Sequence, residues 1–144
     1  MAKFLTPLTV TEVSDSVFAV AGQPFRYQSD LLPPPGAIEV PVGFYTDFAS
    51  VPRFMPLAYA CVGDTAHEPA VVHDWLYYSA LTDRKTSDAI FLEAMKLKGM
   101  SAWRYWPIYW GVRTGGWKAW NDHRAKSNAK VGKFSASPNI AGKA

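Results

Sequence analysis

The order of the periodic segments is the feature that most constrains the fold of this chain. Short runs rich in β-branched and aromatic residues, bounded by turn-forming residues, occupy the first third, at 9–13, 17–20, 25–27 and 38–42. After residue 65, apolar residues recur at helical spacing instead. Strands that precede the helices, and do not alternate with them, predict an α+β fold with an antiparallel sheet.

The first third predicts one small antiparallel sheet of three to five strands. Ser14, Asp15 and Ser16 supply turn chemistry between the first two strands. The run 33–36, Pro-Pro-Pro-Gly, predicts a stiff connector followed by a turn. Pro41 cannot donate a hydrogen bond to a neighbouring strand, so the strand at 38–42 is expected at an edge of the sheet.

Three helices are predicted to pack on this sheet. Thr65 and Glu68 fit a capping box that opens a helix ending near residue 80. Asp83 or Thr86 begins the second helix, which stops at Gly99. Ser101 begins the third, and Pro107 marks either a kink in it or its later true start.

The third helix carries a stripe of large side chains. Residues at alternating spacings of three and four share one helix face; they are Trp103, Trp106, Trp110, Arg113, Trp117 and Trp120. We expect this stripe to pack in the core, although Trp-rich faces also bind sugar rings or partner proteins. The odd member, Arg113, is expected to pair with a carboxylate, either Asp74 or Asp47.

Length and charge divide the chain into a domain and a tail. The 144 residues fit one domain, which we place at 1–120. Residues 121–144 hold five basic residues and one acid, so the tail carries +4 and the remainder −1. We expect a flexible, extended tail; nucleic-acid binding is disfavoured because no aromatic residues alternate with the basic ones.

Other composition features favour a protein that is made in the cytoplasm and stays soluble. The N-terminus has no continuous apolar segment typical of a signal peptide, and no stretch reaches the length of a membrane span. The single cysteine, Cys61, allows no internal disulfide and is interpreted as a small buried residue.

Three ionisable residues stand inside apolar segments and are the candidates for chemistry. Asp47 lies in GFYTDFASVPR at 43–53, and His73 and Asp74 are adjacent in VVHDWLYY at 71–78. An ionised group in such surroundings is costly unless it is paired or bound to a metal. We therefore predict that the three share one polar cluster, and that Asp74→Ala costs about 3–5 kcal/mol if Asp74 is paired with a buried arginine.

A divalent metal is one way to satisfy this cluster. Asp47, His73, Asp74 and Asp88 form a ligand set that suits zinc or manganese with open positions for water. Such an ion generates hydroxide at neutral pH, and a spare carboxylate acts as general base. The alternative is a structural network in which Asp74 pairs with Arg53 or Arg84, or the cluster pairs with Arg113.

Two other catalytic patterns are weaker. Ser50 with His73 and Asp47 supplies the residue types of a triad, but Ser50 lacks the flanking glycines of a nucleophile elbow. His67, together with the metal candidates, gives only the loose spacing of a helical phosphohydrolase, and the β-rich beginning does not fit such a domain. No glycine-rich phosphate loop or dinucleotide fingerprint is present.

Several motifs in order resemble one family. These are GFYTDFASVPR, HDWLYY, Arg84 with SDAIFLEAM, and YW-x-VR-x-x-GW-x-AW, spread over roughly residues 17–120. Together they resemble the phage and prophage domain-of-unknown-function family 1353. The resemblance implies a phage setting, in which the protein is made in the host cytoplasm and can still become part of a virion. It marks Asp47, His73, Asp74 and Asp88 as motif positions, but it implies no reaction.

Two functions from different classes follow. The first is a metal-dependent hydrolase that acts on cell-wall or other polymeric material during infection, with Asp47, His73 and Asp74 as catalytic residues and Arg53, Tyr77 and Arg113 as binding residues. The second is a non-enzymatic virion or tail-associated protein whose partners are other phage proteins. The polymer is inferred from the phage setting alone.

Overall fold

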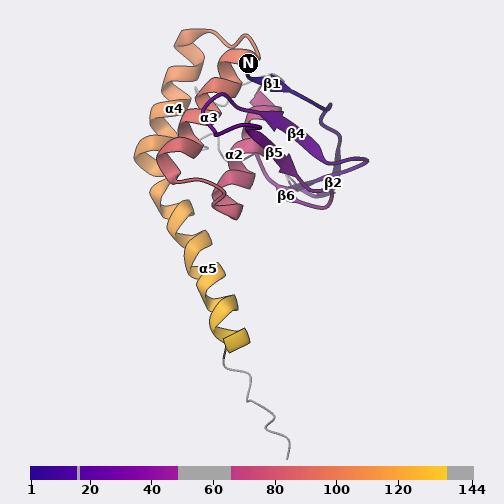
Figure 1. The fold of residues 1–144 in the computed structure, drawn as a ribbon, viewed down its shortest axis with the longest axis vertical. Coiled ribbons are helices and arrows are strands. Elements are labelled where there is room, and N and C mark those ends of the chain that lie inside the picture. The colour runs from indigo at the N-terminus through magenta and orange to yellow at the C-terminus, as the bar shows by residue number, and fades with distance from the viewer. Residues whose placement is uncertain (16, 49–65, 136–144) are drawn as a thin grey trace, which may run out of the picture.

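The predicted order of strands and then helices is confirmed (Figure 1). The computed structural model describes residues 1–15, 17–48 and 66–135, with side chains described as far as residue 128. The strands are β1 (Lys3–Phe4), β2 (Val10–Ser14), β3 (Val17–Val20), β4 (Phe25–Gln28), β5 (Ala37–Val40) and β6 (Tyr45–Thr46). The helices are α2 (His67–Ser79), α3 (Arg84–Leu97), α4 (Ala102–Gly115) and α5 (Trp117–Ser135).

The strands form two small antiparallel sheets where the sequence predicts one. Their orders are β1-β4-β5 and β2-β3-β6. The chain turns at Gly22, which has a φ of +75°. As a result β3 pairs with β6 and not with β4, the strand that follows it in the sequence. β5 lies at an edge of its sheet, as predicted, but it ends at Val40, so Pro41 follows the strand and does not lie within it. The two-residue strands β1 and β6 are too short to give an alternating pattern.

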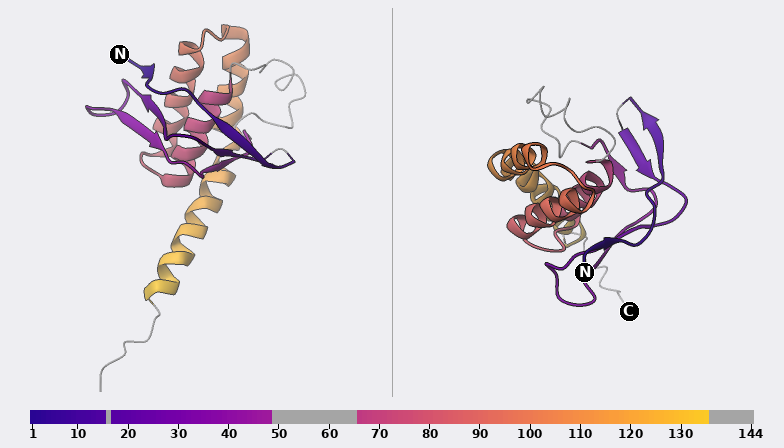
Figure 2. Two further views of the ribbon diagram at one scale, coloured as in Figure 1. Left: turned by 90° about the vertical axis from the view of Figure 1, so that its right-hand side faces the viewer. Right: turned by 90° about the horizontal axis from the view of Figure 1, so that it is seen from above.

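Helices α2 and α3 both pack on the sheets, and the helices lie together on one side of the strands (Figure 2). One core cluster joins both sheets to α2 and α3, through Val20, Phe25, Tyr27, Ile38, Val40, Val71, Val72, Leu76, Ile90 and Ala94. A second cluster joins the start of α2 to α3 and α4, through Ala66, Ala70, Phe91, Met95, Met100, Ile108 and Val112. α2 therefore contributes to both clusters.

Helix ends follow the sequence signals closely in α3. The Asp83 side chain accepts from the Thr86 backbone N–H at 3.0 Å, and Gly99, with a φ of +74°, follows the end of the helix. Ser101 stands at the N-cap of α4 without a side-chain capping bond. At α2 the predicted capping residue Thr65 lies outside the described residues, and Glu68 instead accepts from Lys98 Nζ at 2.9 Å.

The prediction that the tryptophan stripe packs in the core is wrong. Four of its members are exposed, by 67, 41, 58 and 56% at Trp103, Trp106, Trp110 and Trp117. α4 buries Ile108 and Val112 instead, and Pro107 lies inside the helix. The spacing correctly placed Trp103, Trp106 and Trp110 on one face of α4, but spacing alone does not tell which face meets the core. Trp120 of α5 packs against Tyr77 instead.

Helix α5 extends away from the body of the molecule (Figure 1). It runs to Ser135, so residues 127–135 are helical where the sequence predicts an extended segment. The flexibility of the tail and the boundary at residue 120 stay predictions, and residues 136–144 lie outside the described part. No helix within the described ranges is long and apolar enough to cross a membrane.

Candidate active site

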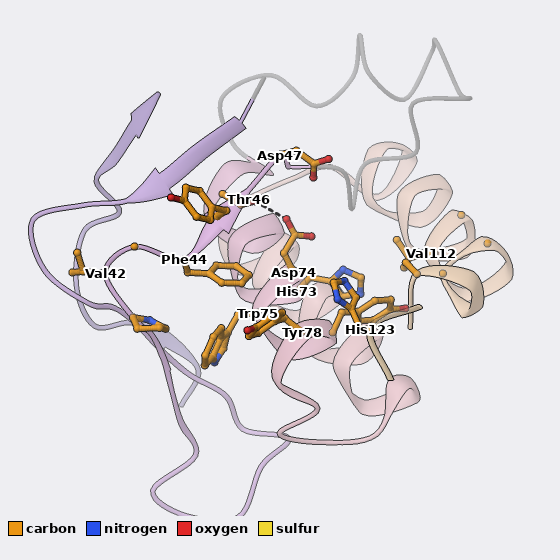
Figure 3. A pocket seen from close by; sticks show the side chains of 18 residues that line it. Val42, Phe44, Thr46, Asp47, His73, Asp74, Trp75, Tyr78, Val112 and His123 are labelled. Atoms are coloured by element: carbon orange, nitrogen blue, oxygen red, sulfur yellow. Dashed lines mark hydrogen bonds between the residues drawn. The ribbon is translucent and has the colours of Figure 1, made fainter. Parts of the chain in front are cut away.

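A pocket of about 750 Å³ lies where three segments meet (Figure 3). The β5–β6 connection, α2 and the α4–α5 junction each provide a wall. Its lining is mainly aromatic and small, with a few ionisable groups; it comprises Pro41, Val42, Gly43, Phe44, Tyr45, Thr46, Asp47, His73, Asp74, Trp75, Tyr77, Tyr78, Gly111, Val112, Gly115, Gly116, Ala119 and His123. Segments distant in sequence thus meet at one cavity of ligand-binding size.

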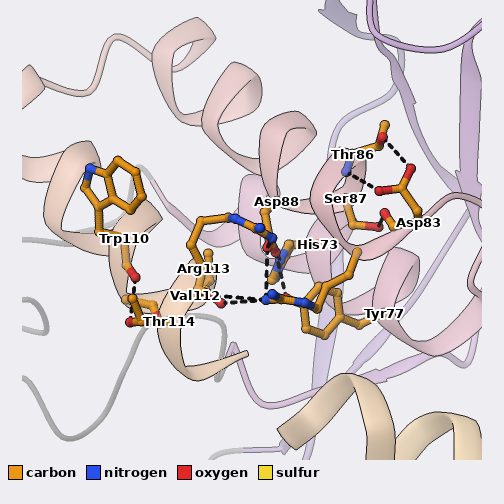
Figure 4. Close-up of polar contacts among 12 residues, drawn as sticks. His73, Tyr77, Asp83, Thr86, Ser87, Asp88, Trp110, Val112, Arg113 and Thr114 are labelled. Carbon is orange, nitrogen blue, oxygen red and sulfur yellow. Dashed lines mark hydrogen bonds and ion pairs between the residues drawn. The ribbon is translucent and has the colours of Figure 1, made fainter. Parts of the chain in front are cut away.

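Asp88 is the centre of a buried polar network beneath the pocket (Figure 4). Its Oδ1 lies 2.8 Å from His73 Nε2 and accepts from the Tyr77 hydroxyl at 2.6 Å. Its Oδ2 accepts from Arg113 at 2.7 Å and from Arg84 at 3.4 Å. The carboxylate is completely buried, so these donors replace the water that an ionised group requires.

The network keeps Asp88 ionised. Burial alone would favour the neutral acid, yet hydrogen bonds from His73, Tyr77 and Arg113 hold the pKa of Asp88 below its ordinary value. Burial, followed by the hydrogen bond to Asp88, raises the pKa of Tyr77, which therefore stays a neutral donor.

The same carboxylate determines the tautomer of His73. Ionised Asp88 can only accept hydrogen bonds, so Nε2 of His73 carries the proton. In the neutral ring Nδ1 is then the basic nitrogen. A histidine held in this way by a buried carboxylate is suited to acid–base work, because the carboxylate stabilises the imidazolium that forms.

Asp74 and Asp47 lie on the pocket wall beside His73 (Figure 3). Asp74 is half-buried and accepts from the Thr46 hydroxyl at 2.5 Å. Asp47 follows β6 directly and is exposed. The three residues that the sequence predicts to cluster thus line one pocket, while the hydrogen bonds described for His73 and Asp74 lead to different partners.

The partner predicted for Arg113 was wrong. Arg113 pairs with Asp88 and not with Asp74 or Asp47, because it lies next to α3 at the end of α4. Tyr77, predicted to bind a ligand, lines the pocket and also donates to Asp88.

Several other candidates lie away from the pocket or outside the described residues. His67 is exposed and packs against Phe48 with ring centroids 4.6 Å apart. Arg53, Ser50 and Cys61 fall in the segment that the structure does not describe.

The predicted metal ligands are only partly brought together. His73 and Asp88 are in contact, but their facing atoms are engaged with one another and with the arginines. Across residues 1–15, 17–48 and 66–128, no group of three or more His, Cys, Asp or Glu is placed to hold a metal ion. The described residues therefore do not by themselves form the four-ligand site, and metal binding stays a prediction.

Sequence reasoning missed the aromatic wall of the pocket. Trp75 and Tyr78 stack with centroids 5.7 Å apart, and Phe44 meets Trp75 edge-on at 5.2 Å. His123 of α5 completes this side, where its ring meets Tyr78 at 6.0 Å. The apolar run around HDWLYY was a usable signal for Trp75 and Tyr78. No sequence signal indicated His123, because it falls in residues 121–144, which the sequence analysis assigned to the tail.

Gly116 sets the distance between the α4–α5 junction and α2. A Cβ built there would lie 2.5 Å from the Tyr77 hydroxyl oxygen, closer than real side chains approach. Only glycine allows this wall to approach Tyr77 so closely.

Comparison with known proteins gives one match. Residues 19–112 match the family described as "Protein of unknown function (DUF1353)". None of the curated proteins or solved structures compared with the chain matches it. The match covers well over half of the sequence and runs from within β3 to within α4, so it includes most of the pocket wall. The chain is therefore a member of the DUF1353 family.

Proposed function

We propose that the pocket is the active site of a hydrolase in which His73 transfers the proton. The observation that carries this proposal is the convergence of His73, Asp74 and Asp47 on one cavity with aromatic walls. Cavities of this kind, with a few convergent ionisable groups, are typical of small-molecule and substrate sites. Its size admits a ring-sized part of a larger molecule. The substrate class that we propose is cell-wall or other polymeric material met in a phage infection.

The geometry supports a specific division of labour. Asp88 orients the His73 ring, which takes a proton from the attacking water as the water oxygen bonds to the substrate. The same ring then returns the proton to the leaving group as the scissile bond breaks. Asp74, beside His73 on the wall, orients the water, and exposed Asp47 contacts the substrate at the rim.

Dye-labelled peptidoglycan is a direct test. Purified protein should release dye, and His73→Gln should lower the rate by about 100-fold or more, the usual contribution of a general base. Asp74→Asn should also lower it. Glu12→Gln on β2, exposed and not among the residues that line the pocket, is the matched control. A wild-type protein that releases no dye, or a folded His73→Gln variant with full activity, would contradict the proposal.

Metal dependence is tested separately in the same assay. The roles above need no ion. If chelation abolishes dye release and zinc or manganese restores it, the metal-dependent mechanism that the sequence predicts is the correct one. Unchanged release after chelation supports proton transfer by His73 alone.

A non-enzymatic role is the second candidate. The completely buried, fully paired Asp88 is also what a structural lock between α2, α3 and α4 would require. This candidate predicts a virion or tail-associated protein that is present in purified particles and inactive on all polymers. Mass spectrometry of particles, combined with the dye assay, distinguishes the two roles.

A further inference from the structure

The outward face of α4 is a surface that neither the core nor the pocket uses. Trp103, Trp106 and Trp110 fall within a sector of about 60° on a helix of 3.6 residues per turn, opposite Ile108 and Val112. All three are exposed, and Trp117 at the start of α5 continues the row seven residues after Trp110. Three exposed tryptophans on one helix face form a larger apolar patch than scattered surface residues would. We call Trp103, Trp106, Trp110 and Trp117 the tryptophan face.

The chain segment that carries the tryptophan face is basic, and exposed Asp122 is the first acid that follows it. Residues 94–121 contain no Asp or Glu and five basic residues: Lys96, Lys98, Arg104, Arg113 and Lys118. Lys98 is paired with part-buried Glu68, and Arg113 with buried Asp88. Lys96 is exposed, and its ammonium lies 5.4 Å from the centroids of both Tyr105 and Trp106. Lys118 is also exposed.

We propose that the tryptophan face binds the surface of an anionic lipid bilayer. Tryptophan rings combine an apolar body with an N–H that stays hydrated, and so favour the boundary between acyl chains and headgroups. Lys96 and Lys118 would meet anionic headgroups beside the rings. α4 would lie along the bilayer surface with its opposite face still packed on the protein.

A second copy of the chain fits this face less well. In a two-fold dimer the same patch faces itself, so Lys96 and Lys118 of one copy would approach the same residues of the other, an excess of positive charge that Asp122 only partly offsets. An anionic bilayer supplies the missing opposite charge. The charge pattern therefore favours a lipid surface over self-association.

Vesicle binding by the full chain tests the proposal. Vesicles with about 30% phosphatidylserine should sediment the protein and shift its tryptophan emission to shorter wavelength, while purely phosphatidylcholine vesicles should bind it weakly. The double variant Trp103→Gln and Trp110→Gln should bind about tenfold more weakly. At low salt, Lys96→Gln should weaken vesicle binding about fivefold. At high salt the variant and wild type should bind alike, because salt screens the attraction to the anionic headgroups.

Controls make the result decisive. Leu81→Gln removes an exposed apolar residue elsewhere and should leave vesicle binding unchanged. Absence of binding to anionic vesicles overturns the proposal, as does binding that the tryptophan double variant retains in full. If sedimentation velocity shows a dimer that this variant abolishes, or if an oligonucleotide binds in place of vesicles, the face serves another partner and the proposal fails.

Discussion

At the scale of single residues, the buried carboxylate of Asp88 accepts hydrogen bonds from four described side chains. Its two oxygens meet donors from α2, α3 and α4, so one carboxylate ties three helices together. The sequence indicated that ionised residues in apolar segments must be paired, but the pairing itself depends on how the helices pack.

Removing the Asp88 carboxylate should therefore be costly. Asp88→Ala leaves two arginines and a histidine without their buried partner, and should lower the free energy of unfolding by about 3–5 kcal/mol. Urea denaturation measures this. Glu12→Ala on the exposed strand β2 should change it by less than about 0.5 kcal/mol. If Asp88→Ala changed the free energy of unfolding as little as Glu12→Ala does, the network would contribute nothing to stability.

His123 should make stability pH-dependent below neutrality. Burial, then Lys126 and Arg124, lower the pKa of His123 below its usual 6.5. The folded protein thus binds this proton less readily than the unfolded chain. The stabilisation is present above the unfolded-state pKa and is lost as pH falls through the lower, folded-state value. The stability of wild type should decline over this range more steeply than that of His123→Gln; parallel curves would contradict the assignment.

At the scale of elements, local chemistry predicted the ends of helices better than their faces. Asp83 and Gly99 bound α3 as expected, because a cap needs only residues adjacent in sequence. The direction of the tryptophans and the division of the strands into two sheets depend on partners distant in the chain. The candidate site was predictable as a set of residue types near His73, whereas the pocket wall from α5 was not.

Arg124 makes the hydrogen bonds described between α5 and the end of α2. Its guanidinium donates to the Tyr77 and Tyr78 carbonyls at 2.7 and 2.8 Å, so it satisfies acceptors at the end of α2. Arg124→Gln should destabilise the protein by about 1.5–3 kcal/mol and expose the amides of residues 117–124 to hydrogen exchange. Lys126→Gln, an exposed neighbour, should do neither. Unchanged exchange in Arg124→Gln would show that other contacts hold α5.

At the scale of the whole molecule, the two core clusters meet along α2 and α3, and Phe48 packs against both. Contacts of α5 with this body include those of Trp120, His123 and Arg124. From these contacts we predict that the folded unit extends past residue 120, where the sequence analysis places the start of the tail.

Two truncations test that boundary. A chain ending at residue 128 should keep nearly the full melting temperature, because it retains His123 and Arg124. A chain ending at residue 120 should melt several degrees lower, since a loss of about 1 kcal/mol lowers Tm by about 2–4 °C in a domain of this size. Equal melting temperatures of the two truncated chains would support a domain boundary at residue 120.

Helix α2 takes part in both the core and the pocket wall, which has a consequence for how the sequence can vary. Val71, Val72 and Leu76 fill the core, while the neighbouring His73, Asp74, Trp75, Tyr77 and Tyr78 line the pocket. Neighbouring positions of α2 thus serve either core packing or the pocket, and few of them can be substituted without disturbing one of the two. In a saturation-mutagenesis screen, residues 71–78 should tolerate the fewest substitutions, and the exposed residues of β2 should tolerate the most.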